Sequence, residues 1–175
     1  AYVKGEVKDA EDALKGARDI IAEQVSEDEQ ARNTVRFAFS RQAVITAKVV
    51  KGKETEADKY RDYFEFSKPL KKCTSHQLLA IRRAEAEGLL KVSISPDDEE
   101  CVERLERRFV RSNNACGEQV AEAVQDAYKR LLKSSIETEF AAQSKEQADE
   151  EAIRVFVQNL RQLLLASPLG QKRVM

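Results

Sequence analysis

Helix breakers are scarce in this chain, because its 175 residues contain only six glycines and three prolines. These two residue types end helices and form tight turns, so their scarcity disfavours an all-β sandwich and favours long helices. The 30 basic and 31 acidic residues balance each other, and 42% of the residues are hydrophobic, enough for one core. We therefore expect a single, mostly α, multi-helix domain rather than a disordered or collagen-like chain.

Two helices are predicted within the first forty residues, at about 10–25 and 31–39, because apolar residues recur there at helical spacing. Ser26 stands three residues before Glu29, the capping-box spacing in which two side chains satisfy free amides at a helix start. The second helix is thus expected to be capped by Ser26, with almost no loop before it. Such a pair forms an antiparallel helical hairpin.

The hydrophobic period changes to two at 43–50, where β-branched residues alternate, and again at 89–95, between Gly88 and Pro96. We predict a strand in each segment and a third short strand near Tyr60. Because two strands alone are marginally stable in water, we expect a small antiparallel β element built on the helical body. Residues 43–95 would then form a β-containing insertion in one domain that covers residues 1–175.

The rest of the chain is predicted to be helical. Polar caps and breakers mark the expected helix boundaries. These residues are Thr74 or Ser75, Gly88, Pro96, 112–114, Ser134 with Glu137, Ser144 with Gln147, and Ser167 with Pro168.

The compartment and the completeness of the chain can also be inferred. The chain begins at Ala1 and its sole methionine is Met175, so we expect a fragment of a longer protein. No segment approaches the ~18 uncharged apolar residues of a membrane span, and the N-terminus has no apolar signal core. An odd number of cysteines at irregular spacing is typical of reduced thiols. We predict a cytoplasmic protein with no membrane contact.

A catalytic or metal site has little support in the sequence. Cys73 and His76 have a C-x-x-H spacing and could join Cys101 and Cys116 around zinc, but each of the latter two is alone on its predicted helix, which favours free thiols. His76 is the only histidine, and no nucleophile elbow, phosphate loop or dinucleotide motif occurs. We therefore predict no enzyme activity, metal, cofactor or small-molecule substrate.

Charge is unevenly distributed along the chain. Residues 41–91 hold 12 basic and 7 acidic residues, whereas residues 92–150 hold 8 basic and 14 acidic residues. Two lysines of the basic segment directly precede a predicted helix start, where free amides and the helix dipole attract phosphate. The candidate nucleic-acid-binding residues are Lys71, Lys72, Arg82, Arg83 and Lys91.

Aromatic residues lie beside these charges at Tyr60, Tyr63, Phe64 and Phe66. They could stack on bases, as in proteins that bind single strands. Alternatively, they pack into the core beneath the β insertion while the lysines merely contact solvent. The two alternatives differ in whether the rings are exposed.

Four separated blocks resemble the Tex family of bacterial transcription accessory proteins, in the helical region that precedes its YqgF domain. The blocks are AEDALKGARDIIAE (10–23), KYRDYFEF (59–66), SHQLLAIRRAEAEGLLKV (75–92) and SIETEFAAQSKEQADEEAIRVFVQNLRQLLLASPL (135–169). The resemblance implies a multidomain parent that associates with nucleic acid and the transcription machinery. It also implies that most RNA binding belongs to an OB-type domain outside this chain.

Two functional hypotheses follow from the resemblance and the charge pattern. In the first, the basic segment adds weak, nonspecific phosphate contacts to a Tex-like scaffold. In the second, the chain is a protein–protein interaction module that positions neighbouring domains or contacts RNA polymerase. Clustering of the five candidate basic residues on one face would favour the first hypothesis, and an exposed apolar patch would favour the second.

Overall fold

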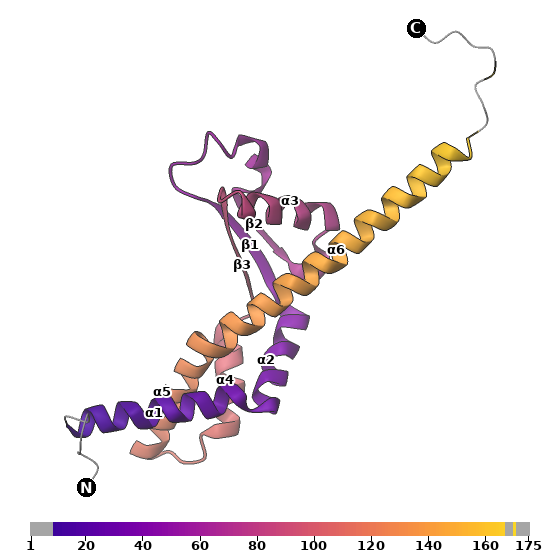
Figure 1. Cartoon of the computed structure of the whole chain (residues 1–175). Coiled ribbons are helices and arrows are strands. Elements are labelled where there is room, and N and C mark those ends of the chain that lie inside the picture. Colours follow the sequence, from indigo (N-terminus) through magenta and orange to yellow (C-terminus); the bar gives the residue numbers. More distant parts are fainter. Residues whose placement is uncertain (1–8, 167–169, 171–175) are drawn as a thin grey trace.

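A long helix connects two groups of elements in the computed structural model, which describes residues 9–166 and residue 170. Helices α1 (Ala10–Glu27), α2 (Glu29–Gln42), α4 (Asp98–Phe109) and α5 (Ala115–Asp126) gather at one end, and a three-stranded sheet with α3 (Ser75–Ala86) lies at the other (Figure 1). Helix α6 (Lys133–Leu164) runs past both groups and projects beyond them (Figure 1). The predicted fold class, mostly α with a small antiparallel β element, is confirmed.

One residue, Asp28, separates α1 from α2. Its carboxylate accepts a hydrogen bond from the Ala31 amide (2.7 Å), so Asp28 caps α2. The prediction that Ser26 caps this helix is wrong, because Ser26 lies in the last turn of α1 and its hydroxyl donates to the Glu23 carbonyl (2.8 Å). A cap must have extended backbone directly before the helix, and Asp28 has that conformation (φ −63°, ψ 121°).

The sheet has the strand order β2–β1–β3, with both neighbouring pairs antiparallel. Strands β1 (Val44–Val49) and β3 (Leu90–Ser95) lie within the two predicted strands. The third strand, β2 (Glu65–Pro69), comes later in the chain than Tyr60. Tyr60 instead belongs to a 3-10 helix (Asp58–Tyr63), η1, which buries its side chain in the core.

One face of the sheet belongs to the core and the other faces outward. Ile45, Ala47 and Ile94 lie on the inner face, in one buried cluster with Leu78 and Ile81 of α3. The outer face carries exposed or half-buried side chains and no fully buried one, as expected for an antiparallel sheet covered on one side.

The predicted boundaries of α3 are confirmed. Thr74 and Gln77 form a capping box at its start, and Gly88 follows its end with the positive φ (68°) that favours glycine. The short 3-10 helix η2 (Leu70–Lys72) connects β2 to this cap.

Helix α5 continues through a π-helical segment, η3 (Ala127–Leu132), directly into α6. The two capping boxes predicted at Ser134 and Ser144 are therefore wrong. These hydroxyls donate to carbonyls of the preceding turn, those of Arg130 (3.2 Å) and Ala141 (3.1 Å). A serine inside a helix can satisfy its hydroxyl in this way, so the spacing alone does not start a helix. The expected stop at 167–168 lies outside the described residues.

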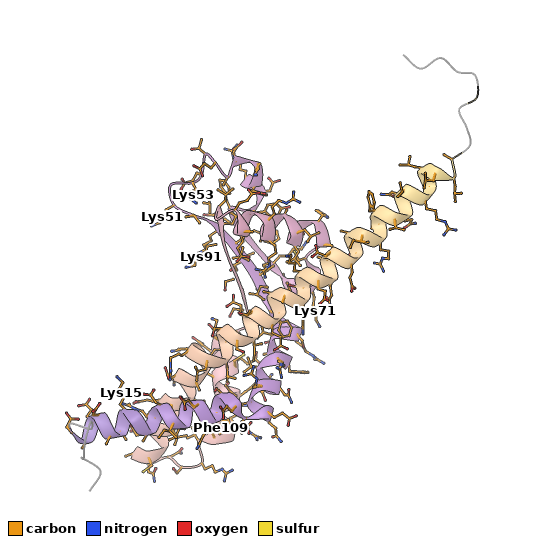
Figure 2. All side chains as sticks on the ribbon, in the orientation of Figure 1. Lys15, Lys51, Lys53, Lys71, Lys91 and Phe109 are labelled. Atoms are coloured by element: carbon orange, nitrogen blue, oxygen red, sulfur yellow. The ribbon has the colours of Figure 1, made fainter. Side chains whose placement is uncertain are left out.

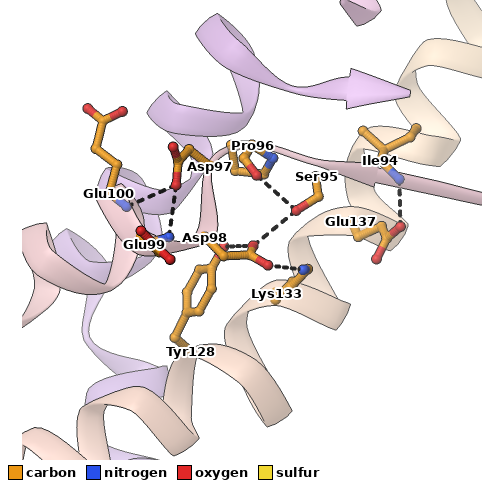
Figure 3. A network of polar contacts seen from close by, with 10 residues as sticks. All are labelled: Ile94, Ser95, Pro96, Asp97, Asp98, Glu99, Glu100, Tyr128, Lys133 and Glu137. Atoms are coloured by element: carbon orange, nitrogen blue, oxygen red, sulfur yellow. Dashed lines mark hydrogen bonds and ion pairs between the residues drawn. The ribbon is translucent and has the colours of Figure 1, made fainter. Parts of the chain in front are cut away.

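A polar network joins α4, the π-helical segment and α6 (Figure 3). Asp98, in the first turn of α4, accepts hydrogen bonds from the Tyr128 hydroxyl (2.7 Å) and the Ser95 hydroxyl (3.0 Å), and its other carboxylate oxygen pairs with Lys133. Burial acts to raise the pKa of Asp98, but the bonds from Lys133, Tyr128 and Ser95 outweigh it and lower the pKa. Burial and the bond to Asp98 raise the pKa of Tyr128, which remains a neutral donor.

Candidate nucleic-acid interface

Lys71 and Lys72 lie on η2, directly before α3. Both are exposed, and neither forms a hydrogen bond or ion pair with a described residue. The α3 N-terminus beside them already has an anion, because the Glu151 carboxylate of α6 accepts a hydrogen bond from the Ser75 hydroxyl. Glu151 and Lys71 also line the same groove between α3 and α6. A phosphate at this helix start would therefore meet a carboxylate as well as two lysines.

Arg82 and Arg83 of α3 line the same shallow groove but differ in exposure. The Arg82 side chain is only 14% exposed and donates to Glu85 (2.7 Å), while its Nε and Nη2 atoms are buried without a hydrogen-bond partner among the described residues. Arg83 is exposed and lines a shallow groove with Lys145 and Asp149 of α6. Arg83 is thus available to a ligand, whereas most of the Arg82 guanidinium is not.

Lys91 lies at the opposite end of the sheet from Lys71 (Figure 2). It is exposed at the beginning of β3 and stands directly opposite Lys48 of β1. The five predicted binding residues therefore occupy three separate places: η2, the outer part of α3 and the start of β3. They do not form one basic face.

The four aromatic residues pack into the fold. Tyr60 is buried and its hydroxyl donates to Glu87 (3.1 Å), and the rings of Tyr63 and Phe66 meet edge to face at 5.6 Å. Phe64 and Phe66 are partly buried against the core. The rings therefore pack as the second alternative expected, since Tyr60 is buried and the other three are partly buried against the core, and they do not form an exposed stacking platform for bases.

An exposed apolar surface runs along the second half of α6. Large apolar side chains recur there every three or four residues along one side of the helix, a pattern that usually marks a buried side. These side chains are nevertheless exposed: Phe156 is 66% exposed and Leu163 is 74% exposed. We name this surface the α6 stripe. It consists of Ile153, Phe156, Val157, Leu160, Leu163 and Leu164.

Periodicity indicated an amphipathic helix here but could not indicate whether its apolar side has a partner. Ala148, five residues before the stripe, is 2% exposed, whereas residues 149–166 are all exposed, so close packing against α6 ends near Ala148. Near its start the stripe meets a groove that α3 and α6 share, lined by His76, Leu79, Ala152 and Phe156 among others.

The amino-acid sequence of the chain matches a known protein family. A family model described as "Tex central region-like" matches residues 1–156, most of the chain. The chain belongs to this Tex family. The resemblance inferred from the four sequence blocks is confirmed.

Several relatives match this chain over nearly the whole length of the chain. The transcriptional accessory protein Tex of Neisseria gonorrhoeae is 36% identical over 178 residues, which cover 97% of this chain and 23% of that protein. Protein tex of Bordetella pertussis is 34% identical over 184 residues, which cover 97% of this chain and 23% of that protein. The S1 RNA-binding domain-containing protein 1 of Homo sapiens is 30% identical over 191 residues, which cover 100% of this chain and 19% of that protein. The chain thus spans about a quarter or less of the length of these relatives.

The three cysteines, which the sequence offered as potential metal ligands, differ in exposure. Cys101 is buried, Cys73 is half-buried and Cys116 is exposed, and burial raises the pKa of the Cys73 and Cys101 thiols. Over residues 9–166 and 170, no group of three or more His, Cys, Asp or Glu side chains could hold a metal ion. None of the described helices combines the length and apolar composition that a membrane span needs.

Proposed function

We propose that this chain is a non-enzymatic helical scaffold of a Tex-like transcription accessory protein, and that the α6 stripe holds a neighbouring part of a longer polypeptide. The observation that carries the proposal is the exposure of six large apolar side chains on one side of α6. Burying one such side chain stabilises a folded protein by roughly 1.5–3 kcal/mol. Contiguous apolar surface of this kind is typical of interaction sites.

The length of the relatives supports an occupant from the same polypeptide. The matched segment covers 23% of the two bacterial Tex proteins, so most of each relative lies outside the part compared here. A stripe at the far end of the longest helix is well placed to contact such additional domains. Contact between the same stripe and RNA polymerase is the alternative.

Hydrogen exchange tests the scaffold proposal. We would compare residues 152–164 in the 175-residue chain with the same residues in a longer polypeptide that continues into the next domain. We expect at least tenfold slower exchange in the longer form, while residues 29–42 of α2, which pack within this chain, exchange equally in both. Equal exchange of residues 152–164 would exclude an occupant from the same polypeptide. In that case, polymerase binding that is lost in Leu160→Ser/Leu163→Ser would support the alternative.

A second proposed activity is weak nucleic-acid association without sequence preference. Exposed lysines without ion pairs among the described residues favour it, including Lys71, Lys72 and Lys91. The name of the human relative includes RNA binding, although this belongs to that protein. With about three phosphates neutralised, we expect the logarithm of the affinity for a single strand to fall with the logarithm of salt concentration at a slope of about −2. Fluorescence anisotropy at several salt concentrations measures this slope.

The chain acts as one central helical region, 1–175, with a β-containing insertion at about 43–95. It works in the cytoplasm without a membrane, metal, cofactor or small-molecule substrate. The name of the Neisseria gonorrhoeae relative, which describes an accessory protein, supports a non-catalytic role.

A further inference from the structure

Two lysines face each other on neighbouring strands near one end of the sheet. Lys48 of β1 pairs in register with Lys91 of β3. The Val50 amide donates to the Leu89 carbonyl (3.0 Å), and hydrogen-bonded pairs alternate along an antiparallel ladder, so Lys48 and Lys91 also form such a pair. Their Cα atoms are then about 5.5 Å apart, with both side chains on the outer face.

This arrangement leaves two positive charges unpaired. Neither ammonium group forms a hydrogen bond or ion pair with any described residue. Like charges directly opposite each other destabilise an antiparallel pair. An anion bound between them would remove the repulsion.

Two further lysines lie at the same end of the sheet. Lys51 and Lys53 flank Gly52 in the turn after β1, and the Lys53 ammonium donates to the Gly88 carbonyl (3.1 Å), which holds the turn beside the beginning of β3. Figure 2 shows Lys51, Lys53 and Lys91 projecting near one another. We name this surface the basic sheet end. It consists of Lys48, Lys51, Lys53 and Lys91.

The nearby carboxylates neutralise only part of this charge. Glu54 accepts from the Gly52 amide (3.2 Å), and Glu87 pairs with Lys59 (2.8 Å). Glu65 stands opposite Lys48 on β2 but forms no ion pair with it. A net positive charge therefore remains at the sheet end.

The rest of the outer face allows close approach of a polymer backbone. The row beside the lysines consists of Ser67, Thr46 and Ser93, which are small hydroxyl residues in register on the three strands. The Thr46 hydroxyl lies 3.4 Å from the Ser93 carbonyl, and Ser67 is exposed. Hydroxyl and ammonium groups are among the donors that proteins use for phosphate oxygens. No ring lies on this part of the face, because Phe66 is on the inner side of β2.

We propose that the basic sheet end binds the phosphate backbone of nucleic acid, with Lys48 and Lys91 as its central contacts. This inference rests on the nucleic-acid association proposed above and locates most of it at this surface rather than at Lys71 and Lys72, where Glu151 opposes an anion. Contacts to phosphates alone give affinity without sequence preference.

Charge reversal at matched positions tests the proposal. The 175-residue chain would be titrated into a fluorescent single-stranded RNA at low salt, with a single-stranded DNA of the same sequence and a duplex DNA measured in parallel. Lys48→Glu/Lys91→Glu should lower the RNA affinity at least tenfold and make the salt slope shallower by about 1.4, because two phosphate contacts are lost. Lys15→Glu/Lys129→Glu has the same charge change on α1 and the π-helical segment, at exposed residues that form no ion pair with a described residue. This control variant should lower the RNA affinity no more than twofold.

The possible results distinguish binding at the basic sheet end from nucleic-acid association in general. If the unmodified chain binds none of the three nucleic acids, nucleic-acid association itself is wrong. If it binds and the two double variants lose affinity equally, only the location at the sheet end is wrong. A larger loss in Lys71→Glu/Lys72→Glu would move the site to η2. Lys48→Gln/Lys91→Gln, which adds no negative charge and removes the repulsion between the two lysines, should have a melting temperature at least as high as the native chain and still weaken binding.

Discussion

The Glu137 carboxylate of α6 accepts a hydrogen bond from the Ile94 amide of β3 at 2.7 Å (Figure 3). Ile94 lies on an edge strand, and its amide points away from β1, so this side chain satisfies a group that the sheet leaves unpaired. The long helix is therefore tied to the sheet by a charged hydrogen bond as well as by packing.

We predict that Glu137→Ala destabilises the chain by about 1–3 kcal/mol, because the largely buried Ile94 amide loses its acceptor. Glu137→Gln retains a carbonyl oxygen at the same place and should have a smaller effect. Urea denaturation followed by circular dichroism measures both. If Glu137→Gln and Glu137→Ala destabilise the chain equally, loss of the hydrogen bond from Ile94 is not the cause.

The network around Asp98 should make stability depend on pH. Its pKa is lower in the folded chain than in the unfolded chain, so the folded state binds fewer protons in the acid range. This stabilisation is complete above the ordinary carboxyl pKa of about 3.9 and is lost as the pH falls through the folded-state pKa. We expect Asp98→Asn to reduce the loss of stability between about pH 5 and pH 3. An unchanged pH profile would contradict this assignment.

Tyr128 should contribute to the same network through its hydroxyl alone. The side chain is fully buried, and Tyr128→Phe preserves its shape while removing one donor to Asp98. We expect a destabilisation of about 1 kcal/mol at neutral pH. In the Asp98→Asn background the same substitution should have a smaller effect, because the charged acceptor is gone. A double-mutant cycle by urea denaturation tests this coupling.

Two glycines in helices should respond oppositely to substitution by alanine. At Gly117, in the first turn of α5, an added Cβ would overlap the Ser112 carbonyl, so Gly117→Ala should destabilise by about 1–3 kcal/mol. At Gly16 of α1 the added carbon meets no atom within 4 Å, and alanine should stabilise the helix by about 0.5–1 kcal/mol. Thermal melting of both variants provides the comparison, and a decrease at both positions would contradict the argument.

Stripe residues should matter little to the stability of this chain by itself. Leu160→Ser/Leu163→Ser should change the free energy of unfolding by no more than about 0.5 kcal/mol per substitution, because both side chains are exposed. Ile136→Ala, on the buried part of the same helix, should destabilise by about 2–5 kcal/mol. A large effect of the stripe substitutions in the 175-residue chain would mean that the stripe is already covered, for example by a second copy.

The local structure could be predicted from the sequence with good accuracy. The strands at Val44–Val49 and Leu90–Ser95 were evident from alternation, and the end of α3 from Gly88. One error is the strand predicted near Tyr60, which is a 3-10 helix, with the third strand only at Glu65–Pro69. The other errors concern the helix caps at Ser26, Ser134 and Ser144, because a serine hydroxyl can bond to the preceding turn as easily as it can cap a helix start.

Sequence by itself determined which segments are helices and strands and which sides of them are apolar, because both depend on the periodicity of neighbouring residues. Tertiary structure alone decided that Lys91 stands opposite Lys48 and far from Lys71, since strand register and the path of the chain bring together residues that are distant in sequence. It also decided that α6 buries Ile136 and leaves Leu163 exposed. The apolar pattern continues along the helix, but the side chains that could cover it end near Ala148.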